Sequence, residues 1–203
     1  MISKGLLDDA RGAASANADA LFAAATRGEP IVFLEPSCLS AVKEDAPALL
    51  RGEAQRKARV VAGACLLFED YLEQQWKAGH AALDLKGGPA RVLLHGHCHQ
   101  KAMGVLPPAR ALLSRIPGAT VIDLDAGCCG MAGSFGYARE HYDVSRAIGE
   151  RKLLPAARAM TADTVLVAPG TSCREQVRHF TGARALHPAE LLRSSLPRAS
   201  RLP

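Results

Sequence analysis

The stretch Thr120-Val-Ile-Asp-Leu-Asp-Ala-Gly-Cys-Cys-Gly-Met-Ala-Gly-Ser-Phe-Gly-Tyr137 passes from an apolar run into a glycine-rich segment that carries two adjacent cysteines, Cys128 and Cys129. Neighbouring residues of a strand point to opposite faces, so a packed core has little use for two adjacent thiols. In a glycine-rich loop, however, the backbone can turn sharply and approach a ligand, so both thiols can face one metal centre. The stretch therefore predicts a strand that ends in a soft-metal site.

Strand and helix signals alternate on both sides of this stretch. Short apolar runs typical of buried strands lie at 31–34, 91–94, 120–124 and 164–168. Helical patterns lie between them at about 3–27, 39–50, 53–78, 105–115 and 138–160, with further helices after Cys173 and near the C-terminus. Strands that alternate with helices favour an α/β fold with a mostly parallel sheet.

A weak internal repeat indicates two related halves. Val32-Phe-Leu-Glu-Pro-Ser-Cys-Leu-Ser-Ala-Val42 resembles Val167-Ala-Pro-Gly-Thr-Ser-Cys-Arg-Glu-Gln-Val177, and each reads as a strand, a proline, Ser-Cys and a helix. The segment 84–90 contains Gly-Gly-Pro and is the clearest linker. We expect two related Rossmann-like lobes with mostly parallel sheets: 1–85 as the remainder of a first lobe, 86–192 as a complete second lobe, and 193–203 as a loose tail.

Five of the six cysteines follow the carboxyl end of a predicted strand, which is the edge of an open α/β sheet where ligands bind. They are Cys38, Cys98, Cys128, Cys129 and Cys173. Thiolates are soft ligands suited to iron–sulfur clusters, zinc or Cu(I), and four cysteines usually hold an iron–sulfur cluster. The spacing alone leaves iron and zinc open, and reduced core thiols are the alternative. Cys65 lies in an apolar helical pattern and is expected to be a buried core thiol.

Three histidines and three glycines lie beside these cysteines. His95, His97 and His99 surround Cys98; they are candidates for metal ligands, for hydrogen bonds to cluster sulfur, or simply for capping the loop. Gly130, Gly133 and Gly136 recur at every third residue before a helix, a pattern that resembles an anion cradle. We expect His97, His99, Gly130 and Gly133 to contact an anionic cluster.

Composition excludes several functional classes. The 203-residue chain has a formal charge of +5, but acidic residues are interleaved with the basic ones, so no coherent basic face for nucleic acid is visible. No apolar stretch reaches the roughly 20 residues that a transmembrane segment needs. The N-terminus lacks the pattern of a signal peptide. These features predict a cytoplasmic protein, with a peripheral position at the inner face of the membrane as a further option, and a reducing compartment favours metal ligation over disulfides.

The motifs His-Gly-His-Cys98-His-Gln, Gly-Cys128-Cys129-Gly-Met-Ala-Gly and Thr-Ser-Cys173 resemble the cysteine-rich CCG domain of heterodisulfide reductases. They resemble still more the iron–sulfur part of FAD-linked D-2-hydroxyacid dehydrogenases, such as glycolate oxidase and D-2-hydroxyglutarate dehydrogenase. The resemblance runs from about Ile2 to His187. It implies two α/β lobes with cluster ligands between them, and transfer of electrons from a reduced flavin to a quinone or an electron carrier.

The chain departs from the family pattern in its last element. The family has a cysteine, a Cys-Cys pair and then Cys-x-x-Cys, whereas here that element ends at Gln176 and, in the first copy, at Ala41. This departure favours an ordinary [4Fe-4S] cluster on Cys98, Cys128, Cys129 and Cys173, with Cys38 close by. Residues 2–11 resemble the segment that follows a first Cys-Cys-Gly, so we expect the protein to extend upstream of Met1.

The resulting prediction is an electron-transfer domain in which no side chain acts as a catalytic acid or base. FAD and the oxidation of the substrate would belong to a partner dehydrogenase domain or subunit. Two alternatives stay open: a structural or interaction module that holds zinc at the same thiolates, and a fragment that binds no metal and has no activity of its own.

Overall fold

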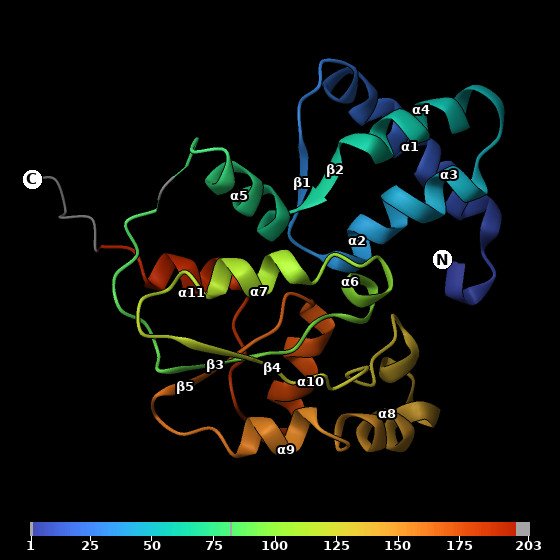
Figure 1. The fold of residues 1–203 in the computed structure, drawn as a ribbon. Coiled ribbons are helices and arrows are strands. Elements are labelled where there is room, and N and C mark those ends of the chain that lie inside the picture. Colours follow the sequence, from blue (N-terminus) through green and yellow to red (C-terminus); the bar gives the residue numbers. More distant parts are fainter. Residues whose placement is uncertain (1, 82, 198–203) are drawn as a thin grey trace, which may run out of the picture. The chain divides into compact units, whose positions relative to one another are not determined.

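The computed structural model describes residues 2–81 and 83–197, and the predicted loose tail therefore lies mostly outside the described residues. The chain divides into two compact units, Met1–Phe68 (the amino-terminal unit) and Glu69–Pro203 (the carboxyl-terminal unit). Each described unit holds one small sheet with only parallel strand pairs, surrounded by helices (Figure 1). The α/β fold predicted from the alternating pattern is thus confirmed.

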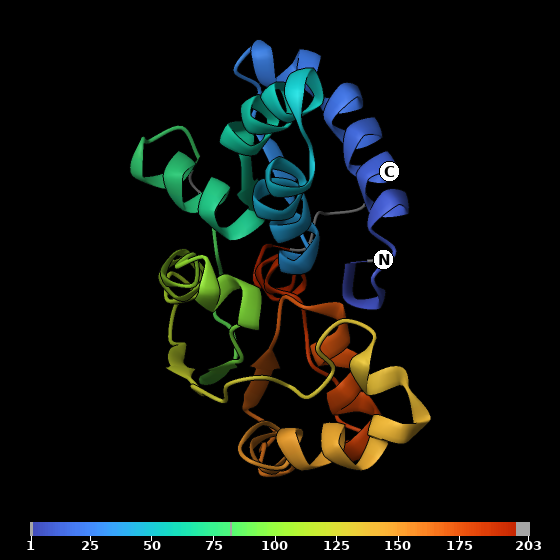
Figure 2. The same ribbon diagram turned by 90° about the vertical axis from the view of Figure 1, so that its right-hand side faces the viewer.

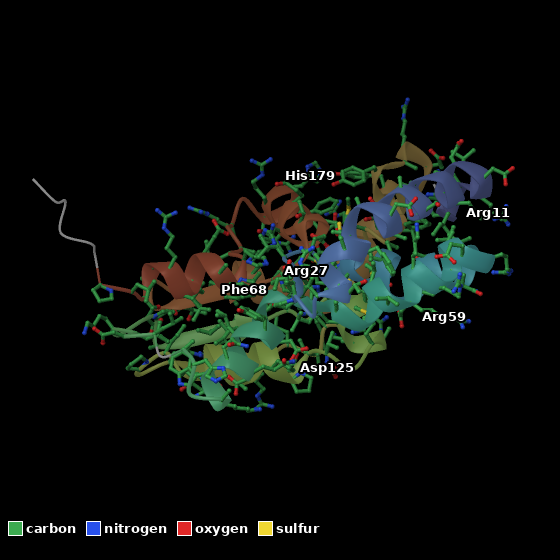
Figure 3. All side chains as sticks on the ribbon, turned by 90° about the horizontal axis from the view of Figure 1, so that it is seen from above. Arg11, Arg27, Arg59, Phe68, Asp125 and His179 are labelled. Atoms are coloured by element: carbon green, nitrogen blue, oxygen red, sulfur yellow. The ribbon has the colours of Figure 1, made fainter. Side chains whose placement is uncertain are left out.

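The amino-terminal unit is mostly helical. In chain order it comprises a 3₁₀ turn (Ile2–Lys4), α1 (Leu7–Thr26), β1 (Ile31–Phe33), α2 (Pro36–Ser40), a π-helical turn (Ala41–Asp45), α3 (Ala46–Leu49), α4 (Gly52–Ala64) and β2 (Cys65–Leu67). Ala18, Ala46 and Ala58 form a small-residue core with Leu50 that brings α1, α3 and α4 together. Arg11 on α1 and Arg59 on α4 lie outside this core and are exposed (Figure 3).

The predicted helix over 53–78 is wrong in its middle. Helix α4 ends at Ala64, the three residues of β2 pair in parallel with β1, and α5 (Phe68–Lys77) begins directly afterwards. A short apolar run between two helical patterns cannot be recognised as a strand from periodicity, because its pairing partner lies more than 30 residues away in the sequence. Cys65 is buried as expected, but it begins a strand and does not lie within a helix.

The carboxyl-terminal unit carries the three-stranded sheet. Its elements are α5, β3 (Arg91–Leu94), α6 (Cys98–Ala102), α7 (Pro107–Leu113), β4 (Thr120–Asp123), two 3₁₀ turns (Phe135–Tyr137 and Arg139–His141), α8 (Tyr142–Gly149), α9 (Leu153–Arg158), β5 (Thr164–Val167), α10 (Thr171–Thr181) and α11 (Pro188–Ser194). The strand order is β4-β3-β5, so β3 lies in the centre. The single helix predicted over 138–160 is in fact a 3₁₀ turn followed by α8 and α9.

Helices cover both faces of this sheet (Figures 1 and 2). Leu93 of β3 and Leu166 of β5 belong to one buried cluster with Leu154 of α9 and Val177 of α10. Val92 and Leu94 point to the opposite face, which α7 and α11 cover, and both are fully buried. Burial of each such leucine contributes about 1.5–3 kcal/mol, and this two-sided burial stabilises the sheet.

The strand–loop–helix pattern of the internal repeat recurs in the structure. β1 leads through Pro36 into α2, and β5 leads through Pro169 into α10. Each of these strands also pairs in parallel with a later segment of its own unit, β1 with β2 and β5 through a bridge from Val167 to Leu186. Within the described residues, no helix combines the length and the hydropathy required to cross a membrane.

Candidate metal centre

The three parallel strands of the carboxyl-terminal unit end at the same edge of the sheet. The segment after β3 carries the histidines and Cys98, the segment after β4 carries Cys128 and Cys129, and the segment after β5 leads to Cys173 in α10. Because β3 is central, the loop with Cys98 lies between the other two loops. The sheet order therefore gathers four thiols from three separate parts of the sequence.

The loop after β3 is fixed by a cap on α6. His97 is the N-cap residue: its Nδ1 accepts a hydrogen bond from the backbone N–H of His99 at 3.2 Å. Gln100 completes a capping box, because its Oε1 accepts from the backbone N–H of His97 at 3.1 Å. Cys98 is consequently the first residue of α6, and its Sγ lies 3.9 Å from His97 Nδ1.

The Cys-Cys-Gly loop needs glycine at position 130 for two reasons. Gly130 has a φ of +103°, and a Cβ built there would lie 2.1 Å from the backbone oxygen of Ser145. This close approach lets the Gly130 N–H point at Cys128 Sγ, at 3.3 Å. Lys101 and Lys152 hold the same loop from the side, donating to the backbone oxygens of Gly127 at 3.4 Å and Asp125 at 3.0 Å.

A second close approach occurs at Gly170, the N-cap residue of α10. A Cβ at this position would lie 2.3 Å from His97 Cδ2 and 3.2 Å from Cys173 Sγ. The absence of a side chain thus lets the imidazole of His97 and the thiol of Cys173 come close to the same point. The contribution of Gly170 was not foreseen from the sequence, because its φ is ordinary and only its neighbours reveal its role.

The tightest group of potential ligands is His95, Cys129 and Cys173. One donor atom from each lies within 4.8 Å of the others, and all three residues are buried. Neither ring nitrogen of His95 has a hydrogen-bond partner of good geometry among the described residues, although both are shielded from solvent. A buried imidazole with free nitrogens beside two thiols is well placed to ligate a metal or to donate a hydrogen bond to cluster sulfur.

Each of the four thiols has a pKa that is shifted by a neighbouring thiol. Hydrogen bonding to Cys128 raises the pKa of Cys98, and hydrogen bonding to Cys128 and Cys173 raises the pKa of Cys129. Conversely, hydrogen bonds from Cys129 and Cys98 hold the pKa of Cys128 well below its usual range. The pKa of Cys173 is lowered by Cys129 first and then by the nearby His95.

This arrangement fits an iron–sulfur cluster. The donor set consists of four soft sulfur atoms, two of which, on Cys129 and Cys173, lie within 4.8 Å of each other, and a bound cation would take the place of the shared protons. The N–H of Gly130 points at the sulfur of Cys128, and the buried imidazole of His95 lies beside Cys129 and Cys173, where it can act as a further donor. No general base or nucleophile–base pair is needed to explain the geometry.

The structure places the remaining predicted residues differently. Cys38 belongs to the amino-terminal unit, where it is exposed in α2, and its assignment as a ligand stays a prediction. Gly133 has a φ of +65° and open space where a Cβ would lie, so glycine is needed there for the conformation of the turn and not for close packing. His99 has a buried Nδ1 without a partner among the described residues. The sequence signal for His95 is its place directly after the buried strand β3, two residues before His97.

Comparison with known proteins agrees with this picture. Residues 92–178 match the model of a family described as "CCG: Cysteine-rich domain". The chain is 30% identical over 197 residues to a subunit of the anaerobic glycerol-3-phosphate dehydrogenase of Escherichia coli K12, covering 97% of this chain and 48% of that protein. It is 29% identical over 191 residues to D-2-hydroxyglutarate dehydrogenase of Pantoea ananatis, covering 93% of this chain and 18% of that protein.

The chain thus spans about half the length of the first relative and less than a fifth of the second. The matched segment begins in β3 and ends in α10, so it encloses the three strand-end loops and all four thiols of the candidate centre. The motif, the fold and the comparison therefore agree: residues 92–178 are similar to the cysteine-rich CCG domain.

Proposed function

We propose that the carboxyl-terminal unit binds one [4Fe-4S] cluster through Cys98, Cys128, Cys129 and Cys173 and passes electrons from a flavin to a downstream acceptor. The observation that carries this proposal is the position of four cysteines after three strands that end at one sheet edge, with Cys129 and Cys173 beside the buried His95. When bound, the cluster supplies reversible one-electron chemistry. The protein holds it through thiolates and excludes water from the buried side of the site.

The surrounding residues would tune rather than perform this chemistry. The N–H of Gly130 and the imidazole of His95 are donors near sulfur, and such hydrogen bonds shift the potential of a cluster. His97 and His99 order the loop that carries Cys98. We propose that Gly130 and Gly133 shape the loop around the cluster, and that Cys38 contributes to the same function from the related lobe within 1–85.

The partner in this proposal is an FAD-linked dehydrogenase domain or subunit. The names of the relatives supply the support, since one is part of a glycerol-3-phosphate dehydrogenase and the other is a D-2-hydroxyglutarate dehydrogenase. Oxidation of the substrate would take place on the flavin protein, and the lobe at 86–192 would carry the electrons onward to a quinone or an electron carrier. Such a role suits the cytoplasmic side of a membrane.

Anaerobic purification with iron and sulfide analysis and visible and EPR spectra tests the proposal. We expect about four irons and four sulfides per chain and an EPR signal after reduction. A colourless protein with stoichiometric zinc would establish the structural alternative, because zinc has no redox chemistry. A folded protein that binds neither metal would equally refute the relay.

The ligand assignment is tested by two serine variants. Cys128→Ser should abolish cluster binding, because it removes the sulfur that connects Cys98 with Cys129. Cys65→Ser should leave the iron content unchanged, since Cys65 is buried in the amino-terminal unit and its Sγ donates to Val61 O at 3.0 Å. Iron analysis of both variants decides the matter, and the reverse result would overturn the assignment.

A further inference from the structure

A cavity of about 240 Å³ lies behind the Cys-Cys-Gly loop of the carboxyl-terminal unit. We call it the Tyr142 cavity; its lining residues come from the loop, the following 3₁₀ turn, α8 and α10, and are Met131, Gly136, Tyr137, Tyr142, Glu175, Gln176, His179 and Phe180. The side chains of Tyr142 and Tyr137 are 42% and 68% exposed, so the cavity is open to solvent. None of the proposed cluster ligands lines it.

Aromatic side chains are concentrated at this cavity. Only 4% of the chain is aromatic, yet two of its three tyrosines, Tyr137 and Tyr142, line the cavity together with Phe180. The rings of Tyr142 and Phe180 are 5.3 Å apart, and His179 contacts Phe180 edge to face at 4.6 Å. Walls of this kind favour a flat, conjugated ligand, because aromatic rings stack and pack edge to face.

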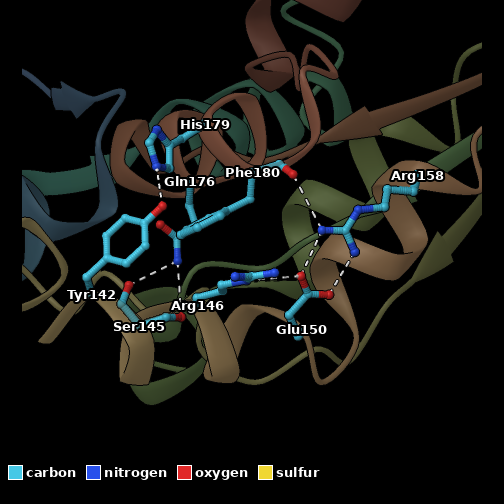
Figure 4. Close-up of polar contacts among 8 residues, drawn as sticks. All are labelled: Tyr142, Ser145, Arg146, Glu150, Arg158, Gln176, His179 and Phe180. Carbon is cyan, nitrogen blue, oxygen red and sulfur yellow. Dashed lines mark hydrogen bonds and ion pairs between the residues drawn. The ribbon is translucent and has the colours of Figure 1, made fainter.

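The polar groups of the cavity favour an uncharged ligand. The hydroxyl of Tyr142 and Nε2 of His179 form a hydrogen bond of 3.0 Å at its rim (Figure 4). Gln176 donates to Ser145 O at 3.2 Å and to Ser145 Oγ at 3.0 Å, so its amide group is held in place. The carboxylate of Glu175 is paired with Arg178 at 2.9 Å. The protic Tyr142–His179 pair therefore remains as the group that can exchange protons with a ligand.

The cavity shares its walls with the candidate metal centre. Met131 follows Cys129 by two residues, and Gln176 lies about one helical turn after Cys173 in α10. A Cβ at Gly130 would lie 3.0 Å from Gln176 Nε2, so the thiol-bearing loop packs directly against this wall. A ligand in the cavity would consequently lie against the loop that carries Cys128 and Cys129.

We infer that the Tyr142 cavity binds a quinone ring of one or two fused rings and is the acceptor site of the relay. A cavity of about 150 Å³ is enough for benzene, so this one has room for such a ring. The inference rests on the proposed function for its source of electrons. Reduction of the quinone takes up two electrons, delivered one at a time, and two protons, and forms two O–H bonds. The Tyr142–His179 pair donates the protons, and solvent protonates the pair again through the exposed His179.

The binding half of this inference is tested with 2,3-dimethyl-1,4-naphthoquinone, whose substituted quinone ring cannot add to free thiols. Anaerobic equilibrium dialysis with the full chain should show saturable binding at about one site. Tyr142→Leu should weaken binding by about tenfold, because it removes a stacking wall and the hydroxyl. Tyr71→Leu, on α5, is the matched control and should bind as the wild type does.

A second pair of variants covers the case in which Tyr142→Leu does not fold. His179→Leu changes an exposed residue at the rim and should also weaken binding, whereas the exposed His80→Leu should not. Absence of saturable binding in the folded wild type, or equal binding by the rim variants and their controls, would overturn the assignment of the cavity.

The acceptor role is tested by reoxidation of the reduced, cluster-loaded protein with the same quinone. Tyr142→Phe should bind the ring within about threefold of the wild type but slow its reduction, since only the proton-donating hydroxyl is lost. Equal reoxidation rates in wild type and Tyr142→Leu would refute the assignment of the cavity as the acceptor site and leave the proposed relay intact. Quinone binding by a chain that assembles no cluster would refute the relay and the acceptor role together.

Discussion

Gly130 shows how little room the Cys-Cys-Gly loop leaves for a side chain. Its φ of +103° is unfavourable for any residue with a Cβ, and the backbone oxygen of Ser145 lies where that Cβ would be. Gly133, three residues later, also has a positive φ but faces open space. An alanine at Gly133 would therefore meet only the unfavourable backbone conformation, whereas an alanine at Gly130 would meet that conformation and a steric clash as well.

Gly130→Ala should lower the free energy of unfolding by roughly 3 kcal/mol or more, because the backbone of α8 cannot move aside without breaking its own packing. Gly133→Ala should cost about 1 kcal/mol, which reflects the left-handed conformation alone. Urea unfolding monitored by circular dichroism gives both values. Equal losses in the two variants would show that the contact with Ser145 does not constrain the loop.

Glu69 is a buried carboxyl group that has no hydrogen-bond partner among the described residues. Burial, with Asp70 beside it, raises the pKa of Glu69 to about 7. Since the folded pKa lies above that of the unfolded chain, the folded state is penalised as pH rises from about 4.5 to 7, and the full penalty persists above pH 7. At low pH the protonated group carries no such penalty.

Glu69→Gln should accordingly remove a pH-dependent loss of stability. Relative to the variant, the wild type should lose roughly 3 kcal/mol of unfolding free energy between pH 4 and pH 8. Urea unfolding of both proteins at a series of pH values measures this difference. Parallel stability profiles over that range would contradict a raised pKa at Glu69.

At the scale of elements, an ion pair between Glu73 and Arg115 connects helix α5 to the rest of the carboxyl-terminal unit. The guanidinium of Arg115, just after α7, donates to both oxygens of Glu73 at 2.8 and 2.9 Å and lies 4.6 Å from the ring centre of Trp76. The side chain of Glu73 is only 4% exposed. Arg115 holds the pKa of Glu73 below its usual range, so this stabilisation is present above about pH 4.5 and is lost as pH falls further.

Arg115→Met should destabilise the carboxyl-terminal unit by about 3 kcal/mol at pH 7, because a buried carboxylate loses its main partner. The double variant Arg115→Met with Glu73→Leu should recover much of that loss. Arg184→Met, which breaks the exposed pair with Glu190, should change stability by less than about 1 kcal/mol. Thermal unfolding compares the three; an equal effect of Arg115→Met and Arg184→Met would show that burial of Glu73 adds nothing.

The elements also show where a prediction from sequence succeeds. The strands at 31–33, 91–94, 120–123 and 164–167 are marked by apolar runs with turn residues beside them, and each lies where the pattern predicts. β2 was missed because its three residues continue a helical apolar pattern, and only pairing with β1 makes them extended. Similarly, the break between α8 and α9 leaves no trace in hydrophobic periodicity.

At the scale of the whole molecule, a single binding event should order several distant parts of the sequence. If the proposed ligand set is right, loading with iron and sulfide should increase protection from hydrogen exchange in the loops at 124–134 and 168–174 together, because both would then carry ligands of one cluster. Protection in α1 should not change. Mass spectrometry of wild type and Cys128→Ser measures this; protection that rises equally in the variant would contradict a shared cluster.

By itself, the sequence determined which chemical groups are available to this protein: soft thiol side chains, glycines in the loop beside them and an α/β alternation that places cysteines at strand ends. Which thiols meet was decided by the tertiary structure, because the order β4-β3-β5 brings three loops to one edge and buries His95 beside Cys129 and Cys173. The Tyr142 cavity likewise exists only where α8 and α10 enclose the loop. Residue types depend on local composition, whereas proximity between distant segments depends on packing, which no local pattern contains.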